Sequence, residues 1–196
     1  MNYTKAKIFN IALKNLRVSI SIQNSNQSDK NTIILNEYYD IAKEQVLKDF
    51  DWNFASSYRE LTLTGNIPMN PKFLYEYDYP NDCIFAHELI SYMDEDISEF
   101  EVAANSSGQK VINANITPAV LRYTKAVENE IFFSTEFTMA LCWYLAFLAA
   151  PAITGNRSIQ SDCLNVYTSI IAKAKSINAS EGYIKNKDNC SWIDIR

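Results

Sequence analysis

An acidic cluster holds the residues whose types and spacing come nearest to metal chemistry. Asp94, Glu95 and Asp96 follow one another, and Glu99 and Glu101 come close behind them. A hard cation needs several oxygen ligands held in a fixed geometry. The cluster has neither the glycine spacing of an EF-hand nor histidines beside it, so we interpret it as a solvated acidic loop. A metal-binding protein that uses Asp94, Glu95 and Asp96 is the alternative.

The single histidine, His87, is the other candidate for catalysis. It lies among Ile84, Phe85 and Leu89, a setting typical of a packed or hydrogen-bonded histidine. No serine or cysteine stands in a recognisable nucleophile motif, and the four glycines form no phosphate-binding loop. The four cysteines show no CxxC pairing, so a zinc site is not indicated. We therefore expect no enzyme, no metal and no cofactor; a small cytosolic enzyme of a mobile element that uses His87 is the alternative.

The composition of the 196 residues suits one globular domain. Hydrophobic residues make up 47% and charged residues 21%, which allows a sizeable core. The 12 tyrosines, 10 phenylalanines and 3 tryptophans suit broad interfaces or the core itself. A net charge of −5 argues against a dedicated nucleic-acid binder, which needs a basic surface to displace counterions.

The sequence carries no pattern of a targeting or membrane-spanning segment. Lysines interrupt the first 15 residues, which therefore do not resemble a signal peptide. The longest apolar run, from Met139 to Ile153, is shorter than the ~20 residues that span a bilayer. Cys142 and Cys163 fall within apolar helical patterns, as small core residues do, and suit a reducing cytosol. These features predict a soluble protein.

Helical periodicity marks the N-terminal part of the chain. Apolar residues at helical spacing predict a first helix from Thr4 to Leu16 and a second from Thr32 to Phe50. The polar residues 23–31 between them predict a loop.

Helical periodicity returns towards the C-terminus. Ser134 is a suitable N-cap for a helix that Pro151 should kink or end, with Gly155 as the stop. A last helix is predicted from Arg157 to Ala179. A polar tail with Ser191 to Arg196 at its end follows Gly182.

The middle of the chain has the patterns of strands and turns. Residues 59–64 alternate with period two, and residues 73–79 alternate aromatic and acidic side chains up to Pro80. Residues 99–103 and 110–113 flank a turn and predict a hairpin, and residues 119–123 predict another strand.

These patterns together predict an α+β fold in a single domain, residues 1–196. Residues 1–55 and 128–181 are expected to form a helical bundle, residues 56–127 a central β-rich insertion, and residues 182–196 a C-terminal tail. A hairpin-based insertion has little core, so we expect it to lean on the bundle or on a neighbouring subunit.

Trp52, Asn53 and Phe54 lie between the second predicted helix and the β-rich region. We expect the two aromatic side chains to anchor the helix end to that region, and the Asn53 amide to pair with exposed helix carbonyls or turn amides. This is a packing role rather than a catalytic one.

Two motifs of the chain are the most specific, Trp52-Asn53-Phe54-Ala55 and Tyr79-Pro80-Asn81-Asp82-Cys83, which is preceded by Tyr77. Together with several shorter motifs along the chain, they resemble the podoviral head–tail adaptor family of short-tailed and crAss-like phages, also known as tail tubular protein A or gatekeeper. Weaker matches cover most of the chain: Asn10-x-Ala12-Leu13, Phe133-Ser134-x-x-Phe137-x-x-Ala140-Leu141, Leu145-Ala146, Ile153-Thr154-Gly155, Tyr167 with Ala174, and Ser191-Trp192-x-x-x-Arg196. The family often has a glycine where this chain has Arg17 or Val18, so the first loop is expected to differ.

The resemblance implies a structural virion protein without catalytic residues. It implies a homo-oligomeric ring, typically a dodecamer, docked under the portal protein at the portal vertex of the capsid. Such a ring extends the DNA channel, lets genomic DNA pass without specific binding, and joins a downstream tail ring or nozzle protein. Around a ring, a mild acidic excess would repel phosphate in the lumen.

Two groups of residues are candidate contacts for these partners. For the portal, the candidates are Trp192, Ile193, Ile195 and Arg196, which could add a strand or insert the tryptophan into a groove. For the tail side, the candidates are Asp94, Glu95, Asp96, Glu99 and Glu101. An ordered strap on its own domain is the alternative for the tail, and a small regulatory adaptor is a further alternative for the protein.

Overall fold

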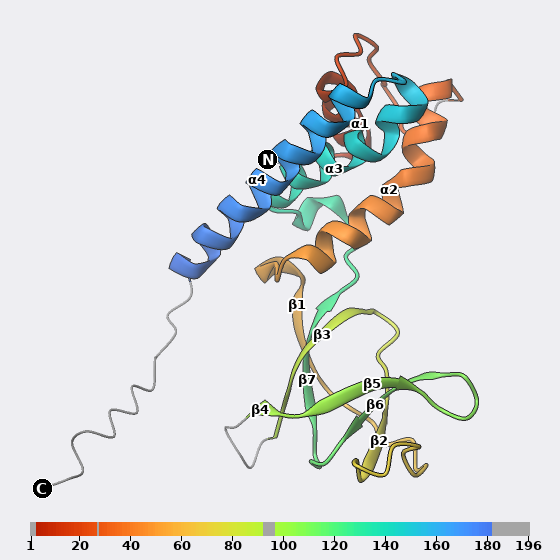
Figure 1. The fold of residues 1–196 in the computed structure, drawn as a ribbon, viewed down its shortest axis with the longest axis vertical. Coiled ribbons are helices and arrows are strands. Elements are labelled where there is room, and N and C mark those ends of the chain that lie inside the picture. Colours follow the sequence, from red (N-terminus) through yellow and green to blue (C-terminus); the bar gives the residue numbers. More distant parts are fainter. Residues whose placement is uncertain (1–2, 27, 92–96, 182–196) are drawn as a thin grey trace, which may run out of the picture.

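The structure, a computed structural model, describes residues 3–26, 28–91 and 97–181. Within these ranges the chain is a mixed α+β protein with four α-helices and two antiparallel sheets. Figure 1 shows the helices gathered at one end of the molecule and the strands at the other. The α+β class predicted from the sequence is confirmed.

The four α-helices begin and end close to the predicted positions. Thr4, Asp29 and Ser134 cap three of them, each accepting a hydrogen bond from a backbone N–H of the first turn. Gly155, with φ of 62°, follows the third helix and so supplies the predicted stop. The bounds are α1 Lys5–Asn15, α2 Lys30–Asp49, α3 Thr135–Ile153 and α4 Arg157–Glu181.

Helix α3 lies at the centre of the helical part, where it contacts α1, α2 and α4. It is apolar on nearly every side, and Pro151 sits in its last turn, two residues before the helix ends. By length and composition α3 alone among the described helices could cross a bilayer. The apolar run from Met139 to Ile153, which lies within α3, was expected to be too short for this. Half of the apolar window in α3 is buried inside the protein, as in a core helix.

The end of α2 is joined to α3 by an aromatic cluster. Trp52 is 3% exposed, its ring centroid lies 5.3 Å from that of Phe137, and its Nε1 donates to the Val46 carbonyl at 2.8 Å. Phe54 also packs on Phe137, at 5.1 Å. The ring contacts of the two aromatics join the end of α2 to α3, and the core that holds them also includes Ile84 and Val127 of the β-rich region. The Asn53 side chain is exposed and makes no hydrogen bond to described residues, so its predicted pairing role is wrong.

The strands form two sheets whose order differs from the order of the sequence. The first sheet has the order β1-β7-β3-β4, with β1 Ser56–Glu60, β7 Val120–Lys125, β3 Cys83–Ile90 and β4 Ile97–Ser98. The second has the order β2-β6-β5, with β2 Tyr75–Asp78, β6 Lys110–Ala114 and β5 Phe100–Ala104.

The predicted hairpin is confirmed, since β5 pairs with β6 across the turn at Gly108. The strand predicted for residues 59–64 is displaced: β1 ends at Glu60, and Leu63 forms only an isolated bridge to Tyr77. Strand β3 was not predicted, because its sequence groups apolar residues on either side of His87 and Glu88 and so lacks the period-two alternation of a strand.

A second core lies between the two sheets, separate from the helical core. It contains eight buried residues: Leu61, Tyr77, Leu89, Ile112, Ala114, Ala119, Leu121 and Tyr123. The expectation that this region rests on a hairpin with little core is therefore corrected, because the sheets enclose apolar side chains of their own.

We predict that Trp52→Ala lowers the free energy of unfolding by ~3–5 kcal/mol, since it removes a buried ring and its hydrogen bond. Chemical denaturation of the purified protein measures this loss. Tyr58→Ala is the matched control, because Tyr58 is 63% exposed and its truncation should cost less than ~1 kcal/mol. Equal losses in the two variants would contradict the assigned role of Trp52.

Candidate functional site

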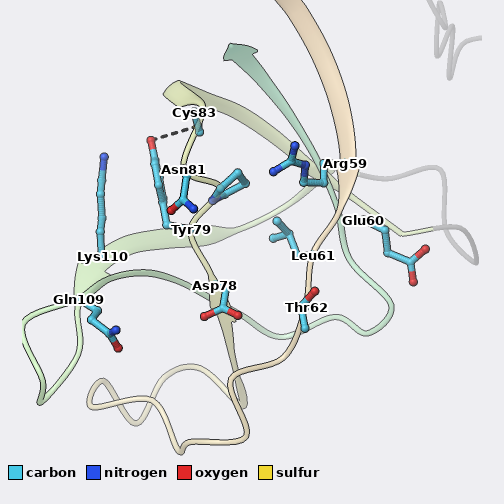
Figure 2. Close-up of a pocket in the computed structure, with 11 residues that line it drawn as sticks. Arg59, Glu60, Leu61, Thr62, Asp78, Tyr79, Asn81, Cys83, Gln109 and Lys110 are labelled. Carbon is cyan, nitrogen blue, oxygen red and sulfur yellow. Dashed lines mark hydrogen bonds between the residues drawn. The ribbon is translucent and has the colours of Figure 1, made fainter. Parts of the chain in front are cut away.

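A groove of about 760 Å³ lies between the two sheets. Figure 2 shows its walls: β1 with the residues that follow it, the turn from Tyr79 to Cys83, and the first residues of β6. That turn connects β2 of one sheet to β3 of the other. The groove therefore opens where the chain crosses between sheets.

The turn itself is held by close contacts among its own side chains. The Cys83 backbone N–H donates to the Pro80 carbonyl at 3.0 Å, and the Cys83 thiol donates to the Tyr79 hydroxyl at 3.1 Å. The Lys110 ammonium lies 3.8 Å from the centre of the Tyr79 ring, a cation–π contact. Burial raises the pKa of the Cys83 thiol and that of the Tyr79 hydroxyl, so both stay protonated at neutral pH.

Asp82 ties the turn to the first sheet. Its carboxylate forms an ion pair with Arg59 at 3.1 Å and accepts a hydrogen bond from the Tyr123 hydroxyl at 3.1 Å. Its backbone carbonyl accepts from the Ala126 N–H at 2.7 Å. Half of the Arg59 side chain is exposed, so the ion pair itself contributes little, and the groove keeps a cation at its edge.

The chemistry of the groove is that of a polar contact surface with charges of both signs. The residues that line its walls include the cations Arg59 and Lys110 and the carboxylates Glu60 and Asp78. In the described part of the chain, no group of three His, Cys, Asp or Glu residues is placed to hold a metal ion. The protonated Cys83 thiol lacks the thiolate character that a nucleophile needs.

His87 lies outside the groove, on β3. Its Nε2 is 2.7 Å from the Thr124 hydroxyl and 3.6 Å from an Asp51 carboxylate oxygen, and its ring packs against Phe85. Burial lowers the pKa of His87 below its ordinary value of 6.5, although Asp51 acts in the opposite direction. The histidine is thus a packed, hydrogen-bonded residue, neutral at pH 7.

Beside His87, Arg122 connects the end of α2 to the first sheet. Its guanidinium donates to Asp51, just past α2, at 2.5 Å and to Glu88 on β3 at 3.0 Å. Arg122 and Glu88 are also cross-strand partners in the pairing of β7 with β3. We refer to Asp51, His87, Glu88 and Arg122 as the polar joint.

Two of the residues predicted to face the tail lie on the second sheet or at its edge. The Glu99 carboxylate binds the Lys72 ammonium at 2.6 Å. The Glu101 carboxylate accepts from the Asn70 amide at 3.1 Å and lies 3.5 Å from the Asn113 amide. Both are therefore paired with the loop before β2, and the Glu99 side chain remains 68% exposed.

The other predicted contact residues are not placed by the structure. Asp94, Glu95 and Asp96, and the portal candidates Trp192, Ile193, Ile195 and Arg196, lie outside the described residues.

The sequence analysis missed the loop of residues 65–74, where Ile67, Met69 and Leu74 are exposed. The available signal was an uncharged stretch of apolar and turn-forming residues, Gly65 to Pro71, between two strand patterns.

Charge is distributed unevenly between the two ends of the molecule. Residues 56–127 contain ten acidic and five basic residues, which accounts for the whole net charge of −5. The helical segments and the C-terminal tail together are neutral. The charge excess of the chain therefore belongs to its β-rich segment.

We predict that Arg122→Met lowers the free energy of unfolding by ~2 kcal/mol, because it leaves Asp51 and Glu88 without their shared cation. Arg59→Met is the control, since it removes a similar but half-exposed arginine–carboxylate pair and should cost ~0–1 kcal/mol. Urea denaturation at neutral pH measures both. A loss for Arg59→Met as large as that for Arg122→Met would contradict a special role for the polar joint.

We predict that His87 makes the protein less stable as the pH falls below about 6.5. A folded-state pKa below the unfolded value means that the unfolded chain binds more protons in this window, so stability decreases with falling pH. The difference in unfolding free energy between pH 7.5 and pH 5.5 should be smaller in His87→Gln than in the wild type. An unchanged difference would show that His87 does not contribute.

Comparisons with known proteins add no family assignment. A scan against models of protein families finds no match to the chain. A search of curated proteins also finds none.

Proposed function

We propose that this chain is a structural virion protein of a short-tailed phage, a head-to-tail connector that forms a ring between the portal protein and the tail. In this proposal the helices form a bundle that builds the ring, and the strands form an insertion that faces the tail. The C-terminal segment, with Trp192, Ile193, Ile195 and Arg196, binds the portal. The protein is part of the virion and is made in the cytoplasm of the bacterial host.

The observation that carries the proposal is where the two most specific motifs of the resemblance lie. Trp52 to Ala55 lies where the chain passes from the helices to the first sheet, and packs on α3. Tyr79 to Cys83 lies where the chain passes from one sheet to the other. Both motifs hold joints between parts of the fold. Proteins that share a scaffold but differ elsewhere in sequence need residues that hold such joints.

Exposed apolar side chains support an assembled state. Large hydrophobic residues are exposed on both ends of the molecule, among them Ile33 and Ile41 on α2, Phe132 before α3, and Ile67 and Met69 before β2. If the protein worked alone, these apolar side chains would remain in unfavourable contact with water. A ring with partners above and below offers surfaces that cover them.

The distribution of charge also suits the proposal. The acidic end carries the whole net charge, and multiplied around a ring it would repel the phosphates of passing DNA. This gives a channel that DNA traverses without specific binding.

Removal of the gene from the phage tests the proposal. We expect capsids that fail to retain DNA and to attach tails, and we expect cryo-electron microscopy of wild-type particles to locate this chain beneath the portal. Normal, tailed and DNA-filled particles in its absence would refute the connector function.

A shortened chain tests the portal contact. Deleting residues 182–196 should abolish binding to purified portal protein and leave the helical circular dichroism signal unchanged, because the helices and both cores lie before residue 182. Substituting the polar stretch Asn186 to Asn189 by serines is the matched control and should preserve binding. Unchanged binding by the shortened chain would exclude the tail as the portal contact.

A further inference from the structure

The loop that precedes β2 displays large apolar side chains to solvent. Ile67 is 90% exposed, Met69 70% and Leu74 69%. Pro68 and Phe73 in the same loop are buried, whereas Pro71 is exposed. We refer to residues 65–74 as the apolar loop.

A buried glutamate holds the first half of the apolar loop. Glu76 on β2 is 2% exposed, and one of its carboxylate oxygens accepts hydrogen bonds from the Thr64 hydroxyl at 2.8 Å and the Asn66 amide at 3.1 Å. The backbone of Thr64 also donates to the Glu76 carbonyl at 3.0 Å. A buried carboxylate is unfavourable unless it is hydrogen-bonded. The bonds of Glu76 to Thr64 and Asn66 therefore fix the start of the loop.

The second half of the apolar loop is held by side chains from the other strands of the sheet. The Asn115 side chain accepts from the Leu74 N–H at 2.9 Å and donates to the Lys72 carbonyl at 3.1 Å. Glu101 accepts a hydrogen bond from the Asn70 amide, and Glu99 pairs with Lys72 at the surface, a contact that contributes little by itself. The exposed apolar side chains thus sit on a loop with a fixed conformation, which reduces the entropy lost when they become buried against a partner.

The position and charge of the apolar loop restrict what can cover it. Figure 1 shows it beside β2, at the end of the molecule farthest from α1 and α3. Residues 56–127, which include the loop, carry the whole charge excess of −5, so burying the loop against the same region of a second copy would bring like charges together. A complementary surface has an apolar depression with basic residues around it.

We propose that the apolar loop is the contact that recruits the downstream tail ring protein, through an apolar depression with a basic rim on that protein. This inference rests on the proposed connector function and adds the residues that make the tail-side contact: Ile67, Met69 and Leu74 bind the partner. Glu99 and Glu101, predicted from the sequence as direct contacts, position the loop.

The test uses a phage that lacks this gene and is complemented with variants of the full chain. Ile67→Asp combined with Met69→Asp places charges where the contact must be dry. Ile20→Asp combined with Tyr58→Asp is the control, because it adds the same charge at exposed apolar residues outside the loop. The amounts of this chain and of the tail ring protein, relative to portal protein, are measured by mass spectrometry of purified particles.

We expect the loop variant to be retained in particles at the wild-type level while the tail ring protein falls at least ten-fold, and the control to retain both. A loop variant that recruits the tail ring protein normally would overturn the inference and leave the connector function intact. A loop variant that keeps the wild-type melting temperature but is itself lost from particles would also overturn it, because the loop would then bind another copy or the portal. Absence of the wild-type chain from particles would instead refute the connector function.

Discussion

The contact between Trp52 and Phe137 is the constraint on which the arrangement of the whole molecule depends. Trp52 stands three residues past the end of α2, and Phe137 lies in the first turn of α3, so the contact joins segments separated by the entire β-rich region. The hydrogen bond from the Trp52 indole to the Val46 carbonyl orients the ring back onto α2. With that ring in place, the chain leaves the helices at a defined point and β1 begins at Ser56. A tryptophan suits this position because it combines a large apolar surface with one directional donor.

The polar joint extends this constraint from the helices to the first sheet. Arg122 reaches from β7 to both Asp51 and Glu88, and His87 packs beside them as a neutral hydrogen-bonded ring. The aromatic cluster and the polar joint therefore connect two separate cores, one helical and one between the sheets. A bidentate arginine is suited to this task because its planar fork can bind two carboxylates in fixed directions.

At the opposite end of the molecule, polar side chains hold a loop whose apolar side chains are exposed. Glu76, Glu101 and Asn115 are committed to the apolar loop, and their hydrogen bonds keep Ile67 and Met69 in water. The isolated chain gains nothing from such an arrangement, since burying those side chains would be favourable. The arrangement becomes understandable when the loop is a surface prepared for a partner.

The sequence by itself determined the local features of this protein. Helical spacing and the cap Ser134 located the helices, and the turn at Gly108 located one hairpin, because these signals act within a few residues. Only the tertiary structure decided which strands share a sheet, that β3 is a strand, and that Trp52 packs on α3. It also decided that Glu99 and Glu101 bind a loop some 30 residues earlier. These outcomes depend on pairing between residues far apart in the chain, where alternation and charge are compatible with several registers and burial selects one.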